Sequence, residues 1–288
     1  MELFEFQKPI YAPASSCHND RVTIQTLIDA HCHVQDGALA SFLDDVLARA
    51  RRAGVVGIIS NGTEPADWQR LSDLAAADAA IWPCYGVHPW GVGRCEAGWF
   101  ERLEEMMRHG PADRPPAVGE IGLDRYVTPR DEALQEAVFR RQLALARRLD
   151  RPAMLHVVRA WPWLTKGLED CPPPAKFLLH AFTGPVEVVA PLAKLGAYFS
   201  VGPAAVAPGR ERAWRALRVV PRDRLVIETD APDFHPRGLE PRLRDETGKP
   251  LNEPANLPHV LTGLATALDI PSAELAEMTT DNAKRLWE

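Results

Sequence analysis

Residues 22–33 read VTIQTLIDAHCH, an apolar run that leads directly into His31 and His33. Alternate side chains of a β-strand point to the same face, so this spacing directs two imidazoles toward one point. Polar sequence begins at Gln35, which places the pair at the C-terminal end of the strand. Two neutral imidazoles suit a divalent cation such as zinc or manganese. Hydrogen-bonded core histidines are the alternative interpretation.

The same strand type recurs along the chain and alternates with amphipathic segments. Helices are expected over 39–53, 131–149 and 186–195. Strands are expected near 22–30, 54–60, 81–86, 116–121, 152–157, 176–181, 197–201 and 224–229. Eight strand–helix units in one chain predict an α/β fold, a closed (β/α)8 TIM barrel, with a doubly wound sheet as the alternative.

A single barrel domain is expected over residues 22–288, preceded by an irregular lead-in over 1–21. The segment 232–258 is rich in Pro, Arg and Asp and is expected to form a long loop over the barrel mouth. With 46% hydrophobic residues, the chain has enough apolar side chains for one large core.

Composition narrows the setting and the partners. A formal charge of −6 gives no global field for long nucleic acid, so any such contact needs a local basic patch or metal-held phosphate. Five cysteines without a Cys-x-x-Cys pair indicate reduced thiols. No secretory signal or membrane-length apolar run is evident, so we expect a cytoplasmic protein without membrane association and without an obligate protein partner.

Further potential ligands stand at other predicted strand ends. They are Glu120, His156, His180 and Asp230. Each alone is explained by a strand that ends at solvent, but a barrel of this kind gathers its strand ends into one active site. With His31 and His33 they make six ligands, which suit two ions that share Glu120 as a bridge. Asp230 can also accept the proton of an attacking water.

Sequence motifs in a fixed order make this chain resemble the TatD family of metal-dependent hydrolases, within the amidohydrolase-like barrel superfamily. The matching stretches are IDAHCH (28–33), YGVHP (85–89), VGEIGLD (118–124), HAFTG (180–184), ETDAP (228–232), NEPANL (252–257) and NAKRL (282–286). The resemblance implies a TIM barrel in which His31, His33 and Asp230 hold one divalent ion and His156 and His180 a second. Glu120 would lie between the two, and zinc or manganese is favoured, with magnesium also possible.

The resemblance also suggests substrate contacts at His88, Arg159 and Glu253. His88 would touch substrate phosphate or the attacking water; a buried, hydrogen-bonded histidine is the alternative. Family members usually carry an arginine two residues after the strand-five histidine, where this chain has Val158, so Arg159 is the replacement considered. Glu253 either approaches substrate or supports the site, or it belongs to a helix start in which Asn252 is the cap.

The resemblance implies metal-dependent hydrolysis of an ester bond, with DNA as the expected substrate. The expected enzyme is a deoxyribonuclease, and the 3′-to-5′ exonuclease activity that is often described for the family is the expected type, with Asp230, Glu120 and His88 in catalytic roles. The residue pattern itself does not separate phosphodiesters from other substrates, because the same metal-activated water attacks esters, lactones and amides. An amidohydrolase or esterase acting on a small metabolite therefore stays open. A catalytically silent binding protein is a third hypothesis, which the full ligand set disfavours.

Overall fold

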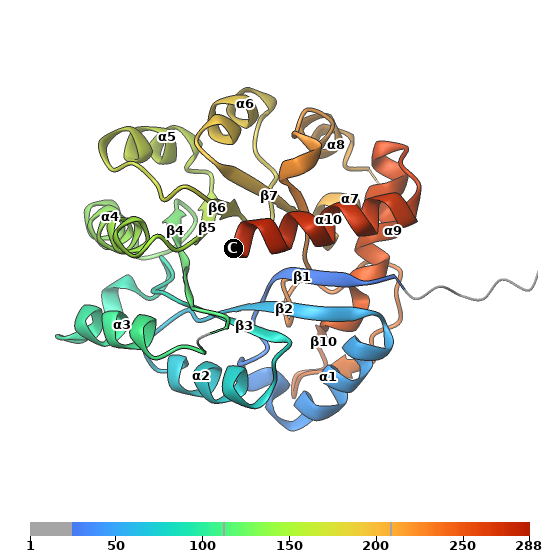
Figure 1. Ribbon diagram of the computed structural model, residues 1–288, viewed down its shortest axis with the longest axis horizontal. Coiled ribbons are helices and arrows are strands. Elements are labelled where there is room, and N and C mark those ends of the chain that lie inside the picture. The colour runs from blue at the N-terminus through green and yellow to red at the C-terminus, as the bar shows by residue number, and fades with distance from the viewer. Residues whose placement is uncertain (1–24, 112, 208) are drawn as a thin grey trace, which may run out of the picture.

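The computed structural model describes residues 25–111, 113–207 and 209–288, and within them eight parallel strands form one sheet (Figure 1). Apolar side chains are buried on both faces of these strands, as expected for a parallel sheet that is covered by helices. The strands are β1 (Leu27–Cys32), β2 (Val55–Asn61), β3 (Ile81–Tyr85), β4 (Ala117–Asp124), β5 (Ala153–Val158), β6 (Phe177–Leu179), β7 (Ala197–Val201) and β8 (Leu225–Ile227).

The strands follow one another around the sheet in chain order, from β1 to β8. Two backbone hydrogen bonds close the ring beyond β8: the Asp230 N–H donates to the His31 carbonyl at 2.9 Å, and the His33 N–H donates to the Ala231 carbonyl at 2.7 Å. The structure is therefore a (β/α)8 TIM barrel, as the sequence predicts. The closing bonds also hold His31, His33 and Asp230 at the same rim.

Helices surround the barrel and cover its outer face (Figure 1). They are α1 (Leu43–Arg52), α2 (Trp68–Ala77), α3 (Trp99–Arg108), α4 (Glu132–Leu149), α5 (Trp161–Asp170), α6 (Val186–Lys194), α7 (Pro203–Val206), α8 (Glu211–Leu217), α9 (Leu257–Leu268) and α10 (Ser272–Trp287). In α4 the Asp131 carboxylate caps the first turn by accepting from the Leu134 N–H at 2.9 Å. Arg147 and Arg148 lie in its last turn, where positive charge favours the helix dipole.

The barrel interior has its own apolar cluster, separate from the layer beneath the helices. Inward side chains such as Ile28, Ile59, Met154 and Leu178 are buried there. Leu286 of α10 joins this cluster, and Figure 1 shows α10 lying across that end of the barrel. With one end filled by apolar side chains, the polar residues of the strands are confined to the opposite, C-terminal rim.

The observed elements differ from the predicted ones in a few places. The segment 232–258 is not only a loop: it contains a two-stranded hairpin of β9 (Leu243–Arg244) and β10 (Pro250–Leu251) and the first residues of α9. The expected first strand begins too early, because β1 starts at Leu27. Residues 22–24 of that expectation and the lead-in over 1–21 lie outside the described residues.

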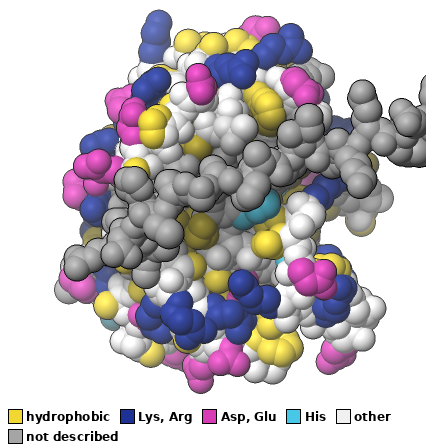
Figure 2. Space-filling model, turned by 90° about the vertical axis from the view of Figure 1, so that its right-hand side faces the viewer, with side chains coloured by type: hydrophobic (Ala, Val, Ile, Leu, Met, Phe, Trp, Pro, Cys, Tyr) yellow, Lys and Arg dark blue, Asp and Glu magenta, His cyan; other side chains and the backbone are white. Residues whose placement is uncertain are grey.

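Two observations describe the surface. None of the helices in the described ranges is long and apolar enough to cross a bilayer. Figure 2 shows one face of the molecule, on which Lys and Arg side chains gather into a band while acidic side chains are scattered around its edge. Local positive surface therefore exists despite the net charge of −6.

Candidate metal centre

The Glu120 side chain lies at the middle of a buried polar cluster and presents its two oxygens to different groups. On the Oε2 side, the Nε2 atoms of His31 and His33 are both 3.4 Å away. Asp230 completes this group, with its Oδ1 3.4 Å from His33 Nε2 and 3.7 Å from His31 Nε2. The three side chains can offer one ligand atom each to a single ion.

The other carboxylate oxygen, Oε1, faces a second set of histidines. His180 Nε2 is 2.9 Å from it, His156 Nδ1 3.1 Å and His88 Nε2 3.4 Å. The His156 and His180 nitrogens are themselves 3.1 Å apart. Glu120 thus divides the imidazoles into two groups, one for each of its oxygens.

Neighbouring acceptors set the tautomers of two of these histidines. His33 donates from Nδ1 to the Asn61 carbonyl at 2.7 Å, which turns Nε2 toward Glu120 and Asp230. His156 donates from Nε2 to Asp124 Oδ2 at 3.1 Å, so its Nδ1 is the atom that would be available to a cation. Such outer partners orient metal-ligating histidines and raise their basicity.

His31 provides the test of whether a cation fits. Its side chain is fully buried, and neither ring nitrogen has a hydrogen-bond partner among the described residues. A buried imidazole without partners is costly. A cation between His31, His33 and Asp230 would satisfy its Nε2 atom, so the donor set fits a divalent metal.

The side chains of this cluster shift one another's pKa values, so that Glu120 stays ionised and His180 stays protonated. Burial alone would raise the pKa of Glu120, but the charges of His180 and His88 outweigh it and hold that pKa well below its usual range. For His180, the carboxylate of Glu120 outweighs burial and keeps the pKa well above its ordinary value. Burial lowers the pKa of His31 and brings that of His88 to about 4. Protons therefore stabilise the carboxylate in the way that bound cations would.

Asp230 is held in place by residues around it. Its backbone lies in the left-handed region at φ 55°. The buried Asp29 carboxylate accepts from both the N–H and the hydroxyl of Thr229. On the other side, Asn252 Nδ2 donates to the Thr229 carbonyl at 2.7 Å. These contacts fix the short segment that carries Asp230 against β1.

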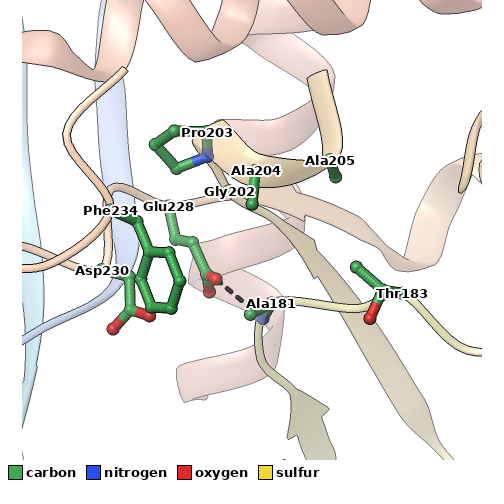
Figure 3. A pocket seen from close by; sticks show the side chains of 9 residues that line it. All are labelled: Ala181, Thr183, Gly202, Pro203, Ala204, Ala205, Glu228, Asp230 and Phe234. Carbon is green, nitrogen blue, oxygen red and sulfur yellow. Dashed lines mark hydrogen bonds between the residues drawn. The ribbon is translucent and has the colours of Figure 1, made fainter. Parts of the chain in front are cut away.

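A small pocket that is open to solvent lies beside Asp230. Figure 3 shows Glu228 and Asp230 side by side on one wall, with Phe234 next to Asp230 and Thr183 across the opening. Glu228 is fully buried and accepts from the Ala181 N–H at 2.7 Å. It thereby holds the loop that follows His180.

The two remaining predicted substrate contacts have different surroundings. Arg159 is exposed just after β5, and its guanidinium carbon lies 4.6 Å from the centre of the Tyr126 ring. The Glu253 side chain is only 2% exposed and pairs with Arg49 at 2.7 Å and with Arg242 at 3.3 Å. Its carboxylate is therefore engaged within the protein, which favours a supporting role.

The alternative in which Asn252 caps a helix start is wrong, because the short 3-10 helix Pro254–Asn256 has Glu253 at the cap position and no side-chain cap bond. The amide of Asn252 binds the Thr229 carbonyl, and Asn256 precedes α9 without a side-chain cap bond. The Oδ1 atom of Asn252 accepts from the Glu253 N–H at 2.9 Å. Asn252 therefore supports the segment after β8 rather than starting a helix.

Three residues that support the site, Asp124, Asn61 and Glu228, are not among those predicted from the sequence. Asp124 stands four residues after Glu120 on β4, an even spacing that puts both on one face, and this was a usable signal. Glu228 stands two residues before Asp230, which is a weaker hint. Asn61 acts through its backbone carbonyl, for which side-chain identity gives no signal.

Comparisons with known proteins identify the family of this chain. The family model described as TatD related DNase matches residues 28–288. The 3′-5′ ssDNA/RNA exonuclease TatD of Edwardsiella piscicida is 33% identical, over 91% of this chain and 99% of its own length. An uncharacterized metal-dependent hydrolase of Bacillus subtilis, YabD, is 28% identical over 91% of this chain and 98% of its own. The crystal structure of the TatD homologue YjjV from Escherichia coli K12 superposes with a TM-score of 0.83 at 29% identity, covering 92% of this chain and 98% of that one. The protein described here belongs to the TatD family.

Proposed function

We propose that this protein is a metal-dependent phosphodiesterase that shortens single-stranded DNA from its 3′ end. The observation that carries the proposal is the division of ligands around Glu120: one oxygen faces His31 and His33, and the other faces His156 and His180. A carboxylate shared in this way suits two cations, and paired cations are a common device for phosphodiester hydrolysis.

Each side chain has a distinct task in this proposal. His31, His33 and Asp230 would hold the first cation, and His156 and His180 the second. When bound, the cations polarise the scissile phosphate and make a water more acidic. Asp230 lies at the edge of the pocket and takes the proton of the attacking water. His88 Nε2, 3.4 Å from Glu120, orients a phosphate oxygen at the same place.

The substrate class rests on the relatives and on local charge. The Edwardsiella relative is named for exonuclease action on single-stranded DNA and RNA. The guanidinium of Arg159 is exposed at the barrel mouth, where it can pair with a phosphate of the incoming strand. Imidazole-rich ligation favours zinc or manganese over magnesium.

A direct test combines metal analysis with a cleavage assay. Protein purified without chelator is analysed for bound metals and then incubated with a 5′-labelled single strand and added Mn²⁺, Zn²⁺ or Mg²⁺. We expect a ladder of products shortened from the 3′ end. Glu120→Ala and Asp230→Asn should abolish the ladder, while His109→Ala, at the exposed end of α3, should cleave like the wild type.

Two outcomes would contradict the proposal. Full cleavage by either Glu120→Ala or Asp230→Asn would overturn the assignment of the site. An intact metal centre that leaves every oligonucleotide uncut, yet hydrolyses a small ester, lactone or amide, would instead support an amidohydrolase or esterase acting on a metabolite.

A further inference from the structure

Three exposed aromatic side chains follow the C-terminal ends of the strands. In the part of the chain that the structure describes, the large aromatic residues with high exposure are Trp90 (59%), Tyr126 (65%) and Phe234 (57%). They follow β3, β4 and β8 respectively. An exposed tryptophan gains little from the hydrophobic effect, and this one lies beside the buried polar cluster around Glu120.

Trp90 contacts the histidines of the second group directly. Its ring centre lies 4.8 Å from that of His88 and 6.2 Å from that of His156, and both contacts are edge-to-face. A flat apolar surface therefore stands one ring away from the candidate ligands. In a nucleotide the sugar separates the base from its own phosphate in the same way. A base stacked on Trp90 would therefore leave its phosphate near the candidate ligands.

The indole is also held in a fixed orientation. Its Nε1–H donates to Asp124 Oδ2 at 2.7 Å, and its backbone N–H donates to His88 Nδ1 at 3.2 Å. Asp124 is itself buried and takes the Tyr126 N–H on its other oxygen at 2.6 Å. Because the side chain is already immobilised, little conformational freedom is lost when a ligand stacks on it.

We propose that Trp90 is a stacking platform for the nucleobase next to the scissile phosphate. The inference rests on the proposed nuclease function and adds the part of the substrate that is recognised. Stacking on an aromatic face tolerates every base, but it requires a base that is free of its complement. Trp90 would therefore make the enzyme indifferent to sequence and selective for unpaired ends.

The experiment is a double-mutant cycle in which one change is made in the protein and the other in the substrate. One partner is Trp90, changed to Leu or to Phe; both variants lose the indole N–H, and only Phe keeps a flat ring. The other partner is a 5′-labelled single strand carrying either a base or an abasic site at the last or the next-to-last nucleotide. Both kcat/KM and the Kd, from fluorescence anisotropy without added metal, are measured.

For the wild type, we expect removal of the base at one of the two positions to weaken kcat/KM and binding about tenfold. Trp90→Leu should lower kcat/KM and binding about tenfold, relative to the wild type, on the normal strand. On the abasic strand the same variant should match the wild type. Trp90→Phe should keep most of the wild-type discrimination. A loss that is equal on both strands would mean that Trp90 only supports His88 and Asp124, and it would overturn the proposal.

The binding measurement distinguishes a failure of the stacking platform from a failure of the proposed nuclease function. Base-dependent binding that requires Trp90, in a protein that cuts no strand, would support the platform and overturn the nuclease. Cleavage without any base dependence would keep the nuclease and overturn the platform. Neither cleavage nor binding would overturn both.

Discussion

The buried ion pair between Arg49 and Glu253 supports a sharp prediction about stability. The Glu253 side chain is 2% exposed, whereas Arg49 is 20% and Arg242 is 59% exposed. Removal of Arg49 leaves a buried carboxylate whose remaining partner is largely screened by water, and such a loss costs about 3 kcal/mol. We therefore expect Arg49→Met to lower the free energy of unfolding by about 3 kcal/mol.

The opposite change should cost less. Glu253→Gln keeps a side-chain oxygen that can accept from the Arg49 Nε–H, so the expected loss is about 1 kcal/mol. Because the carboxylate is no longer charged, adding Arg49→Met to Glu253→Gln should cost far less than Arg49→Met alone. The coupling between the two positions is then about 2 kcal/mol.

The assay is urea unfolding of the wild type, both single variants and the double variant, all in EDTA so that metal binding does not shift the result. Initial rates on a single-stranded oligonucleotide are measured in parallel with metal present. If Glu253→Gln lost more than tenfold in kcat/KM without losing stability, Glu253 would be a substrate contact, and the structural interpretation would be refuted.

Three further predictions concern backbone space, metal and pH. A Cβ at Gly86 would meet the Gly119 carbonyl carbon at 2.8 Å and the Glu120 carbonyl oxygen at 2.9 Å. Gly86→Ala should therefore lower the free energy of unfolding, measured by thermal unfolding, by roughly 1–3 kcal/mol. Gly93→Ala is the control, because a Cβ there meets no atom within 4 Å. Chelation should lower the melting temperature, and Zn²⁺ or Mn²⁺ at about 1,000 times its Kd should restore about 4 kcal/mol; no shift with any divalent ion would contradict the metal centre. Burial would lower the pKa of His33, but the hydrogen bond to Asp230 and the charge of Glu120 raise it to about 9, so cation binding must displace a proton below that pH. The apparent affinity in calorimetry should therefore rise with pH by up to about tenfold per unit up to pH 9, and an affinity independent of pH would show that His33 is not a ligand.

The fold could be predicted because its signals are local. Apolar runs such as 153–158 and amphipathic stretches such as 132–149 carry their own periodicity, and alternation of the two limits the topology to a parallel sheet. Strand ends were less certain, since β8 stops at Ile227, before the polar residues that the expected strand included. The hairpin of β9 and β10 escaped prediction because two-residue strands have almost no periodicity.

The six candidate ligands could also be selected from sequence, for a topological reason. A closed parallel barrel brings all strand ends to one rim, so His31 and Asp230 become neighbours although 199 positions separate them in the chain numbering. How each ring is oriented could not be predicted. The pairing of Arg49 with Glu253 depends on how α1 packs against the segment after β8, and no local pattern encodes that contact.

Asp124 connects the candidate ligands to the rim of the site. Three donors converge on its carboxylate: the Nε2–H of His156, the indole N–H of Trp90 and the backbone N–H of Tyr126. Only a group with acceptors alone can satisfy all three, because an amide would turn a donor toward one of them. One buried side chain thus orients a candidate metal ligand and an exposed aromatic surface together. In the proposed enzyme, the position of the nucleobase and the position of the second cation are therefore set by the same residue.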